Sequence, residues 1–172
     1  AAVCALRMLD MAGIDFENTE VCAMITDGEE AGLRGCKQWA KDHYDEYVNS
    51  GVETAVLCVD TLADLDYLRV YNKDMTGTVK NNQQFSQLVM DSAKDSGHND
   101  LQFSSVYFGS SDAAAFSQAG ITATCLAAMD PKPADYYHNR RDTAGRLVPE
   151  AIKTGFDVII STILNFDEKG LN

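Results

Sequence analysis

Apolar residues recur along the chain in two patterns, one with the period of a helix and one of short unbroken runs. The helical spacing predicts helices over residues 2–11, 36–47, 82–96, 113–118 and 148–166. Pro149 lies in the first turn of the last of these helices, where its missing N–H group costs nothing.

The short apolar runs, several with a β-branched bias, predict buried strands over residues 20–26, 53–59, 67–71, 104–108 and 121–126. A loop with Pro131 and Pro133 follows the last strand. Strands that alternate with helices imply an α/β fold in which a mostly parallel central sheet has helices on both faces. Because no repeat or Gly/Ser linker divides the chain, residues 1–172 are expected to form a single domain.

The composition is that of a globular protein, with 45% apolar residues and a net charge of −12. Such a surface repels phosphate backbones, so a nucleic-acid partner is not expected. The longest apolar run, at residues 158–164, is too short to span a bilayer, so no membrane partner is expected. The acidity either keeps the protein solvated or gathers carboxylates around a metal or a cationic amine.

None of the cysteines lies in a CxxC pair, which argues against a thiolate zinc site; they are Cys4, Cys22, Cys36, Cys58 and Cys125. Their odd number, in a chain of this size, favours a reducing compartment and hence a cytoplasmic location. The first residues have the pattern of an amphipathic helix and lack the features of a signal peptide. Because this helix opens without a cap, the chain is expected to begin inside a larger protein.

Acidic side chains follow two of the predicted strands. Glu29 and Glu30 come after the strand at 20–26, and Asp60 ends the strand at 53–59. Carboxyl ends of neighbouring parallel strands meet at one edge of a sheet. Adjacent carboxylates repel each other unless a cation lies nearby; one could bind zinc while the other takes a proton from water. The simpler interpretations are solvated glutamates at a helix amino end and an aspartate that caps a turn.

His138 is the histidine best placed to complete such a site, because it lies in a loop beside Tyr137. Imidazole is the commonest nitrogen ligand of zinc, although a single loop histidine is more often an ordinary polar residue. His43 lies in a charged helix and His98 in a turn, so both are expected at the surface. The serines of residues 109–116 do not form a G-x-S-x-G elbow, and no Gly-rich phosphate loop is present.

Four segments, taken in order, resemble the zinc-dependent aminopeptidases of clan MH, and most closely peptidase family M28. They are ITDGEEAGLRG (25–35), VLCVD (56–60), SSDAAAFSQAGITA (110–123) and YYHNRRDT (136–143). Each motif is weak alone, but four in this order at suitable separations are hard to obtain by chance. The resemblance extends over nearly the whole chain.

The resemblance implies hydrolysis of the peptide bond next to a free amino terminus, with such a peptide as the partner. It implies that Glu29 is the general base. It also implies that Glu30 and His138 bind one zinc ion and Asp60 binds a second. Tyr137 corresponds to a tyrosine that polarises the substrate carbonyl in some family members.

The sequence departs from the family pattern in two places. Asp112 falls in the S-D-x-x-x-F segment, near the site but not as a ligand, and Ala113 follows it where the family often has histidine. The bridging aspartate and the remaining histidine ligand are expected upstream of Ala1, so the sequence is expected to be a fragment that lacks them. Because two close zinc ions need a bridging anion, we expect partial or empty zinc sites and weakened or absent activity here, and two ions in the intact parent.

Three alternatives stay open from the sequence. Relatives on this scaffold include glutaminyl cyclases and carboxypeptidases, and a third possibility is a peptide-binding relative without catalysis. The peptide-binding alternative is disfavoured, because the sequence retains the residues that such relatives usually lose: Glu29, Glu30, Asp60 and His138. Because family members are often exported, an exported location is the alternative to a cytoplasmic one.

Overall fold

The computed structural model describes residues 1–129, 131–132 and 134–171, and the predicted loop residue Pro133 lies outside the described residues. The strands are β1 (Ala55–Asp60), β2 (Leu68–Asp74), β3 (Val79–Lys80), β4 (Phe103–Ser105) and β5 (Thr122–Ala128). The helices are α1 (Ala2–Met11), α2 (Arg34–Asp42), α3 (Tyr44–Tyr47), α4 (Gln83–Asp95), α5 (Asp112–Gln118) and α6 (Pro149–Lys169). Two 3₁₀ turns lie at Leu65–Tyr67 and Ala144–Arg146.

The strands form one sheet in the order β1-β5-β2-β3, with β4 also paired to β2. The predicted α/β class, with a central sheet flanked by helices, is confirmed. The sheet is mixed rather than mostly parallel, because β2 runs antiparallel to both β5 and β3 while β1–β5 and β2–β4 are parallel. The reason is the short connection at residues 61–67, which holds only a 3₁₀ turn and not the crossover helix that a parallel return requires.

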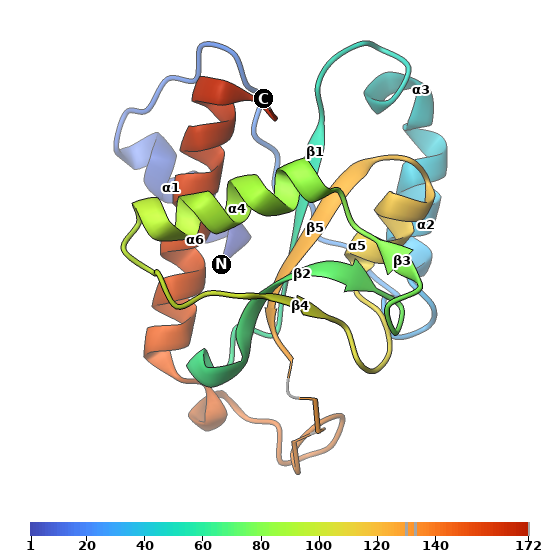
Figure 1. The fold of residues 1–172 in the computed structure, drawn as a ribbon, viewed down its shortest axis with the longest axis vertical. Coiled ribbons are helices and arrows are strands. Elements are labelled where there is room, and N and C mark those ends of the chain that lie inside the picture. Colours follow the sequence, from blue (N-terminus) through green and yellow to red (C-terminus); the bar gives the residue numbers. More distant parts are fainter. Residues whose placement is uncertain (130, 133, 172) are drawn as a thin grey trace.

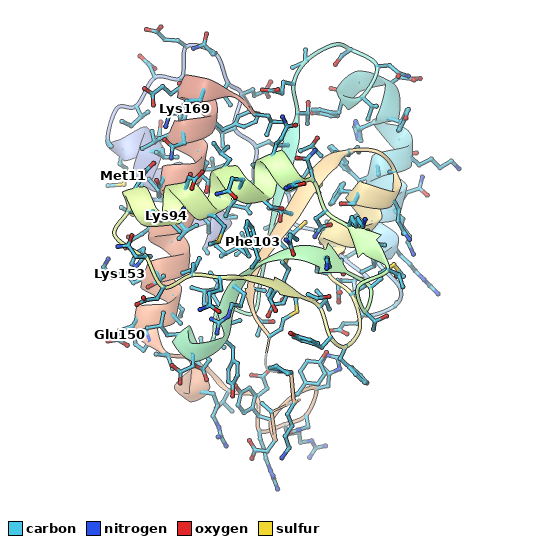
Figure 2. All side chains as sticks on the ribbon, in the orientation of Figure 1. Met11, Lys94, Phe103, Glu150, Lys153 and Lys169 are labelled. Atoms are coloured by element: carbon cyan, nitrogen blue, oxygen red, sulfur yellow. The ribbon has the colours of Figure 1, made fainter. Side chains whose placement is uncertain are left out.

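Helices cover both faces of the sheet. Figure 1 shows α1, α4 and α6 on one side and α2, α3 and α5 on the other. The first group packs Val158 against Leu126, and the second packs Phe116 into a separate apolar cluster. Charged side chains such as Glu150 and Lys153 extend outward from α6 (Figure 2). No helix in the described part of the chain is both long enough and apolar enough to cross a membrane.

Residues 20–26 do not form the predicted strand, because residues 19–28 have no regular secondary structure. A strand is defined by ladder hydrogen bonds to a neighbour. Among the described residues, no such backbone bond is made by residues 15–26, and β1 remains the edge of the sheet. The apolar run predicted burial, yet Ile25 is 83% exposed. An apolar run does not specify which neighbour completes a strand.

The predicted helix at 36–47 is divided in two at His43, where the backbone leaves the helical region (φ −111°, ψ 11°). The His43 ring stacks on Trp39 at 4.8 Å, and its Nδ1 lies 2.9 Å from Glu46. His98 is also half-buried, with its Nε2 atom 3.0 Å from Asp157. Neither histidine is therefore the plain surface residue that the sequence predicted.

Candidate functional site

A tight turn before α2 carries Glu29 and Glu30. Gly28 begins the turn with a φ of +62°, a conformation that glycine adopts without strain. Gly35 approaches the backbone of Asp27 so closely that a Cβ atom there would lie 2.9 Å from the Asp27 nitrogen. The glycines of the predicted motif therefore let the turn fold back on itself, with Glu29 half-buried and Glu30 exposed.

Asp60 lies at the carboxyl end of β1, with an exposed side chain. Thr61 donates a hydrogen bond from Oγ1 to Asp60 Oδ1 at 2.9 Å, and its φ of +41° turns the chain away from the strand. One oxygen of Asp60 thus has a local partner, as expected for a residue that caps a turn. The negative charge of Asp60 is also one of the causes that raise the pKa of Glu29.

The loop after β5 brings His138 to Glu30. The Nε2 atom of His138 lies 2.9 Å from Oε1 of Glu30, and both side chains are more than half exposed. His138 has a left-handed backbone (φ +56°), which is uncommon for a residue other than glycine. Its ring stacks on Tyr137 at 3.8 Å with an interplanar angle of 17°. The tertiary structure therefore joins the first and the last of the predicted motifs.

The carboxylates at this end of the sheet repel one another. The pKa of Glu29 is raised from 4.5 to about 7, firstly by burial and then by the charges of Glu30, Asp60 and Asp112. His138 opposes the shift. A concentration of negative charge that raises the pKa of Glu29 is an environment that a bound cation would stabilise.

A cleft of about 1610 Å³ connects these groups. Its lining includes residues of β1 and residues 18–24. Its lining at the carboxyl end of β1, the lower end in Figure 1, includes all the predicted site residues: Glu29, Glu30, Asp60, Tyr137 and His138. Burial and the charges of the nearby carboxylates raise the pKa of Tyr137 above its ordinary value, and its protonated hydroxyl can donate a hydrogen bond.

These residues fit a zinc ion only in part. Glu30 and His138 are in contact and have the right chemistry for zinc. Within the described ranges of the chain, however, no three or more His, Cys, Asp or Glu side chains form a group that could hold a metal, so Asp60 does not complete a set with them. A catalytic zinc shell usually needs three protein ligands. The assignment of the three residues as ligands stays a prediction.

Two contacts of the site were not predicted. Thr26 Oγ1 donates to Asp112 Oδ2 at 2.6 Å, and Cys36 Sγ donates to Asp112 Oδ1 at 2.7 Å. A threonine and a cysteine are not residue types that by themselves predict a hydrogen bond to an aspartate of a distant helix. The one available signal was position, because Thr26 and Cys36 flank the segment that carries the two glutamates.

The family model for peptidase family M28 matches residues 2–163. A search of the curated proteins finds no significant match. The fold is similar to that of the LapA aminopeptidase from Legionella pneumophila, with a TM-score of 0.67 and 17% identity over 84% of this chain and 38% of that one.

Two further solved structures are similar to the chain. One is BSAP, a zinc aminopeptidase from Bacillus subtilis, with a TM-score of 0.61 and 19% identity over 80% of this chain and 34% of that one. The other is the glutaminyl cyclase of an Acidobacteriales bacterium, with a TM-score of 0.62 and 18% identity over 80% of this chain and 47% of that one. At these identities the likeness is one of fold, and the chain spans less than half the length of each structure.

Proposed function

The chain belongs to peptidase family M28, and on this basis we propose that it contributes the greater part of the active site of a zinc-dependent aminopeptidase. The substrate would be a peptide with a free amino terminus. The observation that carries the proposal is the meeting of the Glu29–Glu30 turn with His138 at one end of the cleft. Acidic side chains at that end would attract the substrate ammonium group.

Glu29 is the general base in this proposal. Its pKa of about 7 suits a group that must both accept and return a proton near neutral pH. Glu29 would take a proton from the attacking water and then deliver it to the leaving amine. Its half-buried position in a hydrogen-bonded turn holds the carboxylate toward the cleft.

Tyr137 is the proposed donor to the substrate carbonyl oxygen. Its hydroxyl is protonated at neutral pH, as for any tyrosine whose pKa is not lowered, and the ring is held by stacking on His138. A hydrogen bond that strengthens as negative charge develops on that oxygen lowers the barrier. The ring is about half exposed, at 51%, which leaves the hydroxyl accessible to a substrate.

Glu30 and His138 would hold one zinc ion, and Asp60 would contribute to a second. When bound, zinc would polarise the carbonyl group and the attacking water. Because the described residues do not gather three ligands, we expect this chain to bind zinc weakly. Equilibrium dialysis against zinc measures this directly, and two tightly held ions would contradict the expectation.

Glutaminyl cyclisation is the second candidate, because one similar structure is a glutaminyl cyclase. A substrate panel separates the candidates: aminoacyl amides, the same amides with a blocked amino group, peptides with a free carboxyl end, and peptides that begin with glutamine. With added zinc, we expect hydrolysis of the unblocked amides alone, and its loss on chelation. Cyclisation of the glutamine peptides, or release of carboxyl-terminal residues, would contradict the proposal.

A further inference from the structure

Asp112 connects both ends of the turn that carries the two glutamates. It lies in the first turn of α5, and each of its carboxylate oxygens accepts one hydrogen bond. Thr26 donates to Oδ2 at 2.6 Å from just before the turn, and Cys36 donates to Oδ1 at 2.7 Å from the start of α2. A single side chain of α5 thus ties together the two segments between which Glu29 is held.

The donor at Cys36 is a thiol and not a thiolate. Burial, followed by the hydrogen bond to Asp112, raises the pKa of Cys36 to about 12. The side chain is completely buried, with 0% exposure, and its Sγ atom also lies 3.4 Å from the Leu33 carbonyl oxygen. The thiol therefore keeps its proton at neutral pH and can donate a hydrogen bond to Asp112.

A buried network fixes Asp112 in turn. Ser111 is the N-cap of α5, and its backbone N–H and its hydroxyl donate to the two oxygens of Asp74 at 3.0 and 2.6 Å. Asp74 has 0% exposure and also accepts from the N–H of Met75 at 2.7 Å. Because a buried carboxylate is stable only with such partners, this network sets the start of α5 firmly at the end of β2.

We propose that Asp112 is a positioning residue for the reaction: it transmits the fixed position of α5 to the turn at 27–33 and so directs Glu29 toward the cleft. The inference rests on the proposed function, because it concerns the placement of the general base. Both oxygens of Asp112 are already occupied by donors, which agrees with its absence from the expected zinc ligands. A displacement of the base by about 1 Å can lower turnover about 10²-fold.

The test uses two matched substitutions at Thr26. Thr26→Val keeps the shape of the side chain but removes the donor, whereas Thr26→Ser keeps the donor. With the zinc-loaded protein and an aminoacyl amide, we expect kcat to fall about tenfold in the valine variant and less than twofold in the serine variant. KM should change little in both, because the groups that bind the substrate remain.

Asp112→Asn gives the larger effect, because it removes the negative charge that strengthens both hydrogen bonds and replaces one acceptor oxygen with an amide donor. We expect kcat to fall about 10²-fold while KM stays within about threefold. Cys36→Ser, which keeps a donor of similar size, should retain most of the activity. If the role were merely structural, the substitutions would lower the melting temperature, but kcat would not fall more than KM changes. Thr26→Val and Thr26→Ser would then have similar kcat values.

Amide hydrogen exchange tests whether Asp112 holds the turn at 27–33 even if the protein proves not to be a peptidase. The amides of Gly32 and Leu33 bond to the Glu29 carbonyl at 3.0 and 2.8 Å. Their exchange should be about tenfold faster in Thr26→Val than in Thr26→Ser, with α5 unchanged. Equal exchange in the two variants would overturn the inference whatever the activity, and so would wild-type kcat for Thr26→Val in an active enzyme.

Discussion

β1 and β5 lie side by side in register, yet they differ in what surrounds them. β5 has a strand on both edges, and its residues 123–128 are buried. In the described part of the chain β1 pairs along one edge only, and it is half-buried from Ala55 to Val59 and exposed at Asp60. The same residue type shows the contrast at one register pair, since Cys125 is 0% exposed whereas its partner Cys58 is only partly buried.

The difference in burial indicates that β5 mainly stabilises the fold, whereas β1 lies beside the proposed reactive groups. Buried apolar surface is the main source of folding free energy, so the buried β5, with α4 and α5 packed on it, contributes more of it than β1 does. The proposed reactive groups belong to β1 and to the turn at 27–33, beside the cleft. Regions with fewer buried contacts open more easily and admit a substrate. Substitutions in the two regions should therefore have different consequences.

The largest effect is expected at the β1 side, from Glu29→Gln. Without a proton acceptor at this position, kcat of the zinc-loaded protein should fall about 10³-fold, equivalent to about 4 kcal/mol in the barrier. Because Glu29 is only half-buried, the melting temperature should stay unchanged or rise slightly as one charge among repelling carboxylates is removed. Steady-state kinetics and thermal unfolding measure the two quantities. Wild-type turnover in this variant would refute Glu29 as the base.

A matched pair of leucines compares the strands themselves. Leu126 of β5 is fully buried, whereas Leu57 of β1 packs on the same apolar cluster from a half-buried position. We expect Leu126→Ala to lower the free energy of unfolding by about 4 kcal/mol and Leu57→Ala by about 2 kcal/mol. Urea unfolding gives both values. If the two losses were equal, the open edge of β1 would not exist in solution.

The smallest effect concerns an ion pair outside both strands. Lys153 and His98 donate to Asp157, and these bonds outweigh burial, so the pKa of Asp157 lies below its ordinary value. A depressed carboxyl pKa stabilises the fold above the unfolded-state pKa of about 3.9, and this stability is lost as the pH falls through the folded-state pKa. Asp157→Asn should therefore cost about 0.5 to 1 kcal/mol at pH 6, and the cost should shrink progressively as the pH falls below about 3.9.

Urea unfolding of Asp157→Asn and the wild type, compared at each pH, measures this difference. A loss that stayed constant with pH would show that the side chain acts through packing instead of charge. A loss above about 2 kcal/mol would show that the ion pair rivals the apolar core around β5, contrary to the comparison of the two strands.

The local pattern was sufficient for most of the elements. Helical spacing predicted α1, α4 and α6, and apolar runs predicted β1, β2 and β5 with small errors at their ends. The motifs also selected the residues that line one end of the cleft. The short β3 was not predicted, because a strand of two residues has no pattern of its own.

The sequence by itself determined which faces of the helices and strands are apolar, and it predicted that the carboxylates, Tyr137 and His138 share one site. Only the tertiary structure decided that residues 20–26 are unpaired, that β2 runs antiparallel to β5, and that Asp112 holds the turn of Glu29. The reason is that periodicity along a chain encodes burial, which is a local property. Hydrogen bonds between distant segments depend on which neighbour the whole fold supplies, and no single segment specifies that.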